Sequence, residues 1–462
     1  MSSSKFFNPI KVTLTDVAGV EHNITKTIAA ISYFEDIYRP FVSANIAVLD
    51  SGVNFYGSLP IQGGEKVKIV VENVKKELVE YELCIWNVYN RSAYQNKQVY
   101  NLALLSEEAL INEGARVTEK FKASPDQIVT NILKNTLGTK KDIFTETCKY
   151  KTSVFPNGRK CHAFIQSLMA KSVPKSSTFK KGIQPEETLP NGELGSNATQ
   201  ASGTAGYLFF ENKSGFIFKS MDLLCSDGSD SFGGSEPVAD YISRPVVGKS
   251  SEIAFNTIEE YQFMDEIDMM DKLNNGIYST HICYFDMASQ KYEEYKYDMS
   301  KTFNNMSHLG SQSSLAKYQK DLSSRPTRIM TILLDNEVWY QGDNIANPEE
   351  DGDAEFPDYA KYYTAQSIGR RYLMENQKVE ITIPGNSNLV VGDKINIFLP
   401  NMAAEEIRNV TPYDEENSGT YLISKLSHNY LFVNESGTPE FVSRLELIRD
   451  TMGIKDYESN VK

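Results

Sequence analysis

The chain has 462 residues, of which 61 are acidic and 47 are basic, so its formal net charge at pH 7 is −14. This balance argues against a protein that grips nucleic acid, because phosphate-binding surfaces need clustered Lys and Arg. No apolar run approaches the roughly 20 residues that a membrane-spanning helix needs, and the N-terminus lacks the apolar stretch of a signal peptide. The length predicts several domains. The absence of such apolar stretches predicts a protein that folds in a reducing cytoplasm and does not bind a membrane.

The cysteines agree with a reducing compartment. They are odd in number, widely scattered and form no Cys-x-x-Cys pair, which argues against a disulfide framework or a zinc site. Three of them lie in apolar surroundings and are expected to act as small core residues. The five residues are Cys84, Cys148, Cys161, Cys225 and Cys283.

Residues 10 to 112 are expected to be all-β. A hairpin is predicted around Val17–Gly19, and Phe41–Leu49 alternates between apolar and polar residues, as a half-buried strand does. After a turn, the sequence continues from Gly64 as Gly-Glu-Lys-Val-Lys-Ile-Val-Val, again with every second residue apolar. Two further strand-like runs follow, at Leu83–Tyr89 and Val99–Leu104.

Residues 113 to about 173 change to a helical pattern. Ser124 followed by Pro125 is typical of the start of a helix, and Gly138 is typical of its end. A second helix is predicted over Cys161–Ser172, where apolar residues recur at helical spacing.

A stretch rich in Pro, Gly, Ser, Thr and Lys at 174–206 predicts a mobile loop. Tyr207–Phe218 then predicts a hairpin with its turn at Asn212–Gly215. Two strands, Ile258–Met270 and Ile277–Phe285, are expected on either side of a turn.

The chain then becomes more polar. A strand pair is expected at Arg328–Trp339, followed by an exposed acidic loop at 347–358 and a helix at Tyr362–Gln377.

The pattern that begins at Gly64 recurs near the C-terminus. Gly-Asp-Lys-Ile-Asn-Ile-Phe-Leu, starting at Gly392, aligns with it without a gap, and strand-like runs again follow at Tyr421–Leu426 and Phe441–Leu447. Three similar runs in the same order favour two similar β-domains. A glycine, an acid, a lysine and alternating apolar residues also begin many ordinary hairpin strands, so periodicity alone leaves the duplication open.

No pattern of a catalytic or metal site stands out, and we expect no enzyme, cofactor or metal. The histidines are far apart, and Cys161 and His162 are neighbours that point apart on a helix. The acids of Glu349–Glu355 lack the register of a calcium loop, so a solvated loop is the simpler interpretation. No Gly-x-Ser-x-Gly elbow occurs. A carboxylate pair for glycoside hydrolysis stays open among the acids, although no spacing indicates one.

Three segments of the chain resemble the baseplate central hub protein of T-even-like contractile-tailed bacteriophages. They are GYLFFENKSGFIFKSMDLL from Gly206, TIEEYQFMDEIDMMDKLNNGIYSTHICYFD from Thr257 and GTYLISKLSHNYL from Gly419. The similar layout extends from about residue 10 to 450, with extra length at 174–206 and 311–358. The resemblance implies an α+β, mainly β fold with two similar tail-tube-like β-barrel domains, a helix-bearing inserted domain and extra loops.

The resemblance also suggests how these domains are divided along the chain. The first tube-like β-barrel domain is expected at 1–112 and the helix-bearing domain, with its mobile loop, at 113–238. The second tube-like domain is expected at 239–450, including an inserted segment at about 301–376, and a polar tail follows at 451–462.

In that family the hub is a homotrimer that forms a hollow cylinder. Two tube-like domains per subunit give a pseudo-sixfold ring, which joins the hexameric tail tube to the trimeric cell-puncturing spike. The implied partners are further copies of the chain, the spike, the tail tube or a tube-initiator protein, and the tape measure protein. DNA passes through the lumen without sequence-specific binding. The implied location is the tail baseplate of the virion, after assembly in the host cytoplasm.

The acidic net charge predicts an acidic lumen that repels DNA phosphates. Other interpretations stay open: an adaptor between tube and baseplate in another contractile injection system, or, less favoured, a β-rich carbohydrate-binding module or hydrolase. Aromatic and Met side chains in a β-context are candidates for subunit contacts, and filling a barrel core is their alternative role. The candidates are Phe34, Tyr38, Phe41, Tyr261, Phe263 and Met264.

Overall fold

Strands account for 45% of the structure and helices for 21%, which confirms the α+β, mainly β part of the predicted fold class. The structure is a computed structural model. It describes residues 8–51, 55–59, 61–72, 77–95, 97–149, 151–176, 204–228, 233–243, 256–264, 268–286, 290–312, 314–334, 359–403, 412–432 and 439–454.

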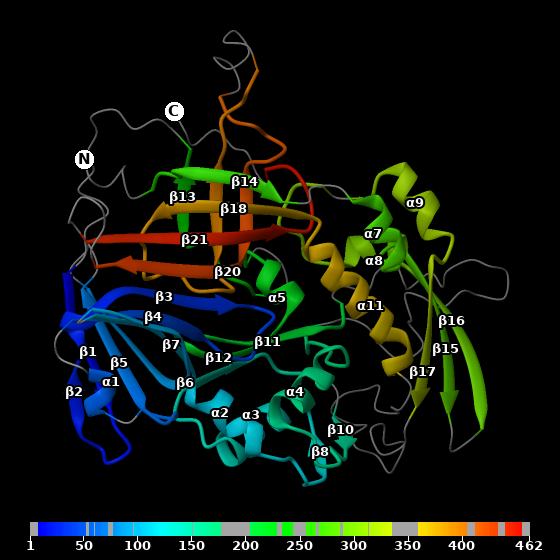
Figure 1. The fold of residues 1–462 in the computed structure, drawn as a ribbon. Coiled ribbons are helices and arrows are strands. Elements are labelled where there is room, and N and C mark those ends of the chain that lie inside the picture. Colours follow the sequence, from blue (N-terminus) through cyan, green and yellow to red (C-terminus); the bar gives the residue numbers. More distant parts are fainter. Residues whose placement is uncertain are drawn as a thin grey trace, which may run out of the picture.

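The largest element is a 13-stranded sheet with strands from both ends of the chain (Figure 1). Its strands are β1 (Asn8–Thr15), β2 (Glu21–Asn23), β3 (Ile28–Asp36), β4 (Ser43–Ser51), β5 (Lys66–Glu72), β6 (Leu78–Tyr94), β7 (Lys97–Leu105), β13 (Ala239–Ile242), β14 (Glu260–Met264), β18 (Gln377–Pro384), β19 (Lys394–Phe398), β20 (Gly419–Leu431) and β21 (Glu440–Arg449). The main path runs β14-β18-β21-β20-β3-β4-β7-β6-β5-β1-β2, and β19 pairs with β20 and β13 beside it. The C-terminal strands therefore join the N-terminal strands where β20 pairs with β3.

The two parts of this sheet have the same strand order. The N-terminal part runs β3-β4-β7-β6-β5-β1, and the C-terminal part runs β14-β18-β21-β20-β19-β13. They differ at the last pair, since β1 pairs with β5 antiparallel and β13 pairs with β19 parallel. The repeated sequence pattern thus corresponds to a repeated topology.

The correspondence extends to single residues at the repeated turn. In each copy a glycine at positive φ donates its N–H to an isoleucine carbonyl on the next strand, and the following acid accepts the N–H of the residue three positions earlier. A one-residue bulge then follows that isoleucine. The residues are Gly64, Glu65, Gln62 and Ile85 in the first copy, and Gly392, Asp393, Val390 and Ile423 in the second.

One apolar core lies under both parts of the sheet. Alternate residues of the repeated strands point into it, such as Val67 and Ile69 of β5 and Ile395 and Ile397 of β19. All four side chains are fully buried. Burying one such aliphatic side chain contributes about 1.5 to 3 kcal/mol, so the period-2 pattern decides which face of each strand turns inward.

The helix-bearing part has a core of its own below the sheet (Figure 1). A helix starts at Pro125 and Gly138 follows it at a φ of +67°, as the sequence predicted. The hairpin turn lies at Asn212–Gly215, also as predicted. The elements are α2 (Glu107–Gly114), β8 (Phe121–Ala123), α3 (Pro125–Asn131) with a π-helical turn (Ile132–Thr136), β9 (Asp142–Thr145), β10 (Thr152–Val154), α4 (Cys161–Met169), β11 (Tyr207–Asn212), β12 (Gly215–Ser220) and α5 (Met221–Cys225).

A third core lies between a three-stranded sheet and a long helix, at the right of Figure 1. The sheet order is β16-β15-β17, and α11 occupies the predicted helix position. The elements are α7 (Met269–Asn274), β15 (Ser279–Asp286), β16 (Lys291–Asp298), α8 (Met299–Thr302), α9 (Lys317–Ser323), β17 (Arg328–Leu334) and α11 (Tyr359–Met374); the short α1 (Phe55–Ser58) lies beside the first part.

The predicted strand Ile258–Met270 is wrong at its C-terminal end, where Met269 and Met270 belong to a helix. Its first half forms β14, but α7 begins after Asp268, whose side chain accepts the N–H of Asp271 and caps the helix. A side-chain cap of this kind stabilises a helix start by about 1 kcal/mol. The apolar alternation of this stretch did not reveal the cap.

Several predictions concern segments outside the described residues. These are most of the loop at 174–206, the acidic loop at 347–358 with the acids of Glu349–Glu355, and most of the polar tail. The domain boundaries stay predictions. The three-stranded sheet begins at Ser279, ahead of the insert expected from about 301.

Within the described ranges, the large sheet is an open path that ends at β14 and β2, so neither half forms a closed barrel by strand ladders. One parallel bridge, between Ile242 and Thr257, links the end of β13 to the residues before β14. None of the helices in the described part of the chain has the length and apolar character to span a bilayer.

Candidate interaction surface

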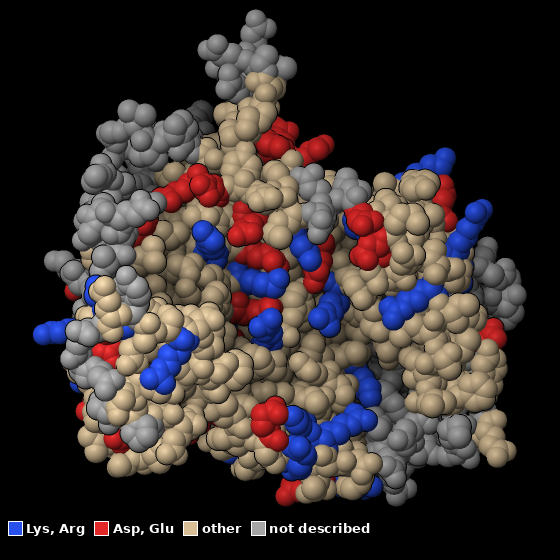
Figure 2. Space-filling view, in the orientation of Figure 1, with Lys and Arg blue, Asp and Glu red and all other residues tan. Residues whose placement is uncertain are grey.

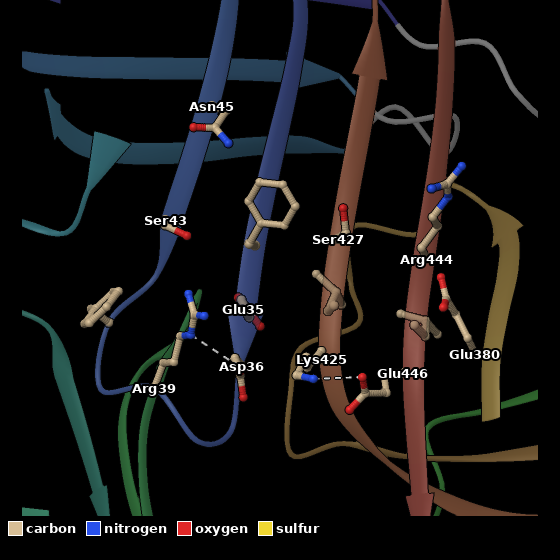
Figure 3. A pocket seen from close by; sticks show the side chains of 14 residues that line it. Glu35, Asp36, Arg39, Ser43, Asn45, Glu380, Lys425, Ser427, Arg444 and Glu446 are labelled. Carbon is tan, nitrogen blue, oxygen red and sulfur yellow. Dashed lines mark hydrogen bonds and ion pairs between the residues drawn. The ribbon is translucent and has the colours of Figure 1, made fainter. Parts of the chain in front are cut away.

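One face of the large sheet carries a groove where the two parts meet (Figure 3). It has a volume of about 640 Å³ and crosses β4, β3, β20, β21 and β18. Strand alternation places Phe34 and Asp36 on this side of β3 and Glu35 on the core side. The groove therefore lies on the face opposite the apolar core.

Charges in the groove are balanced rather than acidic. Asp36 lies 3.6 Å from Arg39, and Lys425 lies 2.8 Å from Glu446. Partial burial opposes the charge of Lys425, but Glu446 outweighs it and raises the lysine pKa. Glu380 and Arg444 add one charge of each sign. Figure 2 likewise shows acidic and basic side chains interspersed over the middle of this face.

Small polar side chains join the two parts of the sheet across the groove. Ser32 of β3 lies opposite Asn429 of β20, and the serine hydroxyl donates to the asparagine oxygen at 2.8 Å. Ser43 and Asn45 on β4 and Ser427 on β20 continue this polar surface. Such side chains add no fixed charge to this face.

The predicted contact residues on β3 and the following turn divide between two environments. Phe34 and Phe41 line the groove. Tyr38 packs against the core, and the guanidinium of Arg371 in α11 lies 4.8 Å from its ring centre. The turn after β3 is thereby held to α11.

The predicted contact residues on β14 lie elsewhere on the sheet. Three strands, β18, β21 and β20, separate β14 from β3. Tyr261 and Phe263 pack against the core and meet with ring centres 6.0 Å apart, while Met264 ends the strand, partly buried. The role of all six predicted residues in subunit contacts stays a prediction.

Beneath the groove, Glu35 joins three parts of the chain. Its carboxylate accepts the Tyr33 hydroxyl at 2.8 Å and the backbone N–H groups of Lys213 at 2.6 Å and Val391 at 2.9 Å. Burial raises the pKa of Glu35 to about 7, although these three donors act in the opposite direction. Sequence reasoning missed this role, because the partners lie far away along the chain.

We expect Glu35 to make folding stability pH-dependent. Its pKa in the folded state is about 7 against an ordinary 4.5, so the folded protein holds a proton that the unfolded chain releases between these values. Stability is therefore expected to fall by roughly 3 kcal/mol as pH rises from 4.5 through 7.

Urea unfolding at a series of pH values, with wild type and Glu35→Gln, measures this effect. The unfolding free energy of the wild type minus that of Glu35→Gln should fall by roughly 3 kcal/mol as pH rises from 4.5 through 7, since only the wild type titrates at this position. A difference that stays constant from pH 4.5 to 8 would contradict the assignment.

A second buried cluster fastens the helix-bearing part to the sheet. Lys141 lies 2.7 Å from Glu108 and 2.5 Å from Glu211. Glu211 also accepts the backbone N–H of Val42, just before β4, at 3.2 Å. Burial opposes the ammonium, but the two carboxylates outweigh it and raise the pKa of Lys141.

A third cluster surrounds Arg370 of α11. This fully buried guanidinium lies 2.7 Å from Asp450, just after β21, and 3.5 Å from Asp222 of α5. His308 contacts the same Asp450 oxygen at 2.7 Å. Burial opposes ionisation of Asp450, yet Arg370 and His308 outweigh it and hold the aspartate pKa far below its usual range.

These clusters act as structural links. Each cluster joins elements from distant parts of the sequence, and the Lys141 and Arg370 clusters do so through ion pairs. Among the residues that the structure describes, no group of three or more His, Cys, Asp or Glu side chains could hold a metal ion. The candidate interaction surface is therefore the groove, together with the edges of the large sheet.

No family model and no curated protein matches the chain. Solved structures do. A tail protein from Neisseria meningitidis MC58 matches with a TM-score of 0.50 and 10% identity, over 95% of this chain and 96% of that one. The 43 kDa tail protein of prophage MuSo2 from Shewanella oneidensis matches with a TM-score of 0.49 and 10% identity, over 96% and 100%.

A third match is the c3393 protein of E. coli, described as a type VI secretion component similar to tail proteins of bacteriophage T4. Its TM-score is 0.40 at 10% identity, over 91% of this chain and 73% of that one. The structural neighbours thus include phage tail proteins, as the sequence resemblance predicted. At this identity the likeness concerns the fold.

Proposed function

We propose that the chain is a non-enzymatic structural hub of a phage tail baseplate. In this role, three copies form a ring that joins the hexameric tail tube to a trimeric spike. The observation that carries the proposal is the repeated strand order within one continuous sheet. The Neisseria tail protein shares the fold over nearly the whole chain, and this likeness supports the proposed role in a phage tail.

The repeat gives a trimer a means of matching a hexamer. Each chain presents two sectors of like topology side by side, joined through β20 and β3. Three chains around a threefold axis would present six such sectors, and a closed ring needs equivalent contacts around it. A sixfold tube could then dock on one side and a threefold spike on the other.

Each sector is proposed to be a tube-like β-barrel domain. The bridge between Ile242 and Thr257 brings the first and last strands of the second sector to one point, which supports near closure there. The proposed divisions remain 1–112, 113–238 and 239–450. The hub would lie in the virion baseplate after assembly in the host cytoplasm, with the tape measure protein as a further partner.

The groove face is proposed to line the lumen through which DNA leaves. The balanced charges of Asp36, Arg39, Lys425 and Glu446 differ from the acidic lining that net charge predicted. Paired charges and Ser and Asn side chains still suit passage of DNA, because the described residues that line the groove include no run of unpaired Lys or Arg to hold phosphates.

The oligomeric state tests this function directly. Native mass spectrometry of the purified protein is expected to show three chain masses, and co-expression with the trimeric spike protein of the same virus should yield a complex of three hubs with three spike chains. A protein that stays monomeric at high concentration and binds no spike would overturn the hub assignment.

A further inference from the structure

Resting on the proposed ring, we infer that neighbouring copies join by antiparallel pairing of β6 of one copy with β14 of the next. The surface is thus two strand edges, and the partner is a second copy of this chain. The contact inside one chain, between β20 and β3, supplies the template.

The template is a ladder of seven residue pairs. Lys425–Leu431 of β20 runs antiparallel to Ala30–Asp36 of β3, with Asn429 opposite Ser32 and Ser427 opposite Phe34. It begins just past the bulge in β20, where pairing with β19 has ended. The two sectors of one chain are joined at this edge.

The strand that corresponds to β20 is β6. The first pair of each repeated strand, Lys66 with Cys84 and Lys394 with Leu422, aligns the two. After the shared bulge, Tyr89 pairs with Asn101 of β7 just as Ser427 pairs with Arg444 of β21.

One extra residue follows in β6, before Ser92, and the registers then agree again. Ser92 pairs with Val99 as Asn429 pairs with Val442. Ser92 is therefore the counterpart of Asn429.

The strand that corresponds to β3 is β14. Ser32 of β3 lies opposite Asn45 of β4, and Gln262 of β14 lies opposite Glu380 of β18. Since β4 and β18 occupy equal places in the two sectors, Gln262 is the counterpart of Ser32, and Met264 is the counterpart of Phe34. The edge of β14 thus has the form of the β3 edge that accepts β20.

Both counterpart edges lack a strand partner within the described chain. β14 is the end of the sheet path and pairs with β18 alone. β6 pairs with β5 only up to Cys84, so its later residues are bonded to β7 on one side only. Ser92, Ala93 and Gln262 are exposed. Unpaired edges of this kind attract another strand.

Applying the template places Ser92 opposite Gln262 of the partner copy and Tyr89 opposite its Met264. The contact is heterologous, because two different edges meet, so copies add head to tail and a ring forms when the rotation closes. In this pairing, the face of β14 that carries Gln262 continues the groove face of the neighbouring copy. The eight strands β14-β18-β21-β20-β3-β4-β7-β6 of each copy would thereby form one continuous inner wall.

Disulfide trapping tests the pairing. The double variant Ser92→Cys, Gln262→Cys in the full chain is oxidised with a mild oxidant and run on a non-reducing gel. Within one chain, the corresponding Ser32 and Asn429 lie directly opposite each other in the ladder. The Cα atoms of such antiparallel pairs are about 4.5 to 5.5 Å apart, a separation that a disulfide can bridge. We expect bands of two and three chain masses that a reductant removes.

Matched variants separate the outcomes. Ser92→Cys with Tyr261→Cys moves one thiol to the opposite face of β14, so it should give at least tenfold less cross-linked product. Ser32→Cys with Asn429→Cys should close within one chain and leave the mass unchanged. Single variants control for native cysteines, and circular dichroism checks that each variant folds.

Two results would overturn the inference, and they differ in what else they overturn. A folded double variant that is trimeric by native mass but gives no cross-link would rule out the β6–β14 contact and leave the hub function standing. A protein that remains monomeric without any cross-link at high concentration would overturn both.

Discussion

Replacing Arg370 with alanine is expected to lower the free energy of unfolding by about 3 to 5 kcal/mol, which is the usual cost of removing one member of a buried ion pair. Arg370, Asp450 and Asp222 are all fully buried. Without the guanidinium, Asp450 loses the cation that lies 2.7 Å from its carboxylate, and the His308 contact remains. The variant should therefore loosen α11 from the end of β21 and from α5.

Urea unfolding followed by circular dichroism measures the loss. Arg371→Ala is the matched control, because it removes the same charge from the next, exposed position. It loses the contact with the Tyr38 ring, worth about 0.5 to 1 kcal/mol. If the two variants lost equal stability, the buried network would not be the link that we describe.

Replacing Gly215 with alanine is expected to destabilise the protein by roughly 2 to 5 kcal/mol, combining backbone strain with overpacking. Gly215 has a φ of +140°, and a Cβ there would lie 2.2 Å from the carbonyl oxygen of Asp142. This pair begins the parallel ladder between β12 and β9. The methyl group cannot be accommodated unless the two strands separate.

Thermal unfolding compares this variant with Gly114→Ala. Gly114 ends α2, and a Cβ there meets no atom within 4 Å, so that substitution should be neutral or slightly stabilising. A Gly215→Ala protein with an unchanged melting temperature would show that the hairpin and β9 shift apart without cost.

Local chemistry made much of the fold predictable from the sequence. The repeated Gly-acid-Lys turns at Gly64 and Gly392, the helix start at Pro125 and the hairpin turn at Asn212–Gly215 all depend on residues close together in the chain. The predicted contact residues divide between the groove and the core, and their role in subunit contacts stays a prediction. Phe34 and Phe41 do line the groove, but Tyr38, Tyr261 and Phe263 pack against the core, because aromatic residues suit both places.

The sequence by itself determined which face of each strand is buried, where the turns lie and that one strand pattern occurs twice, because period-2 alternation and turn chemistry act over a few residues. Only the tertiary structure decided that β20 pairs with β3, that Glu35 meets Val391, and that Arg370 lies between two aspartates. These contacts join residues far apart in the chain, and whether a strand edge or a buried charge finds its partner depends on the packing of the whole core.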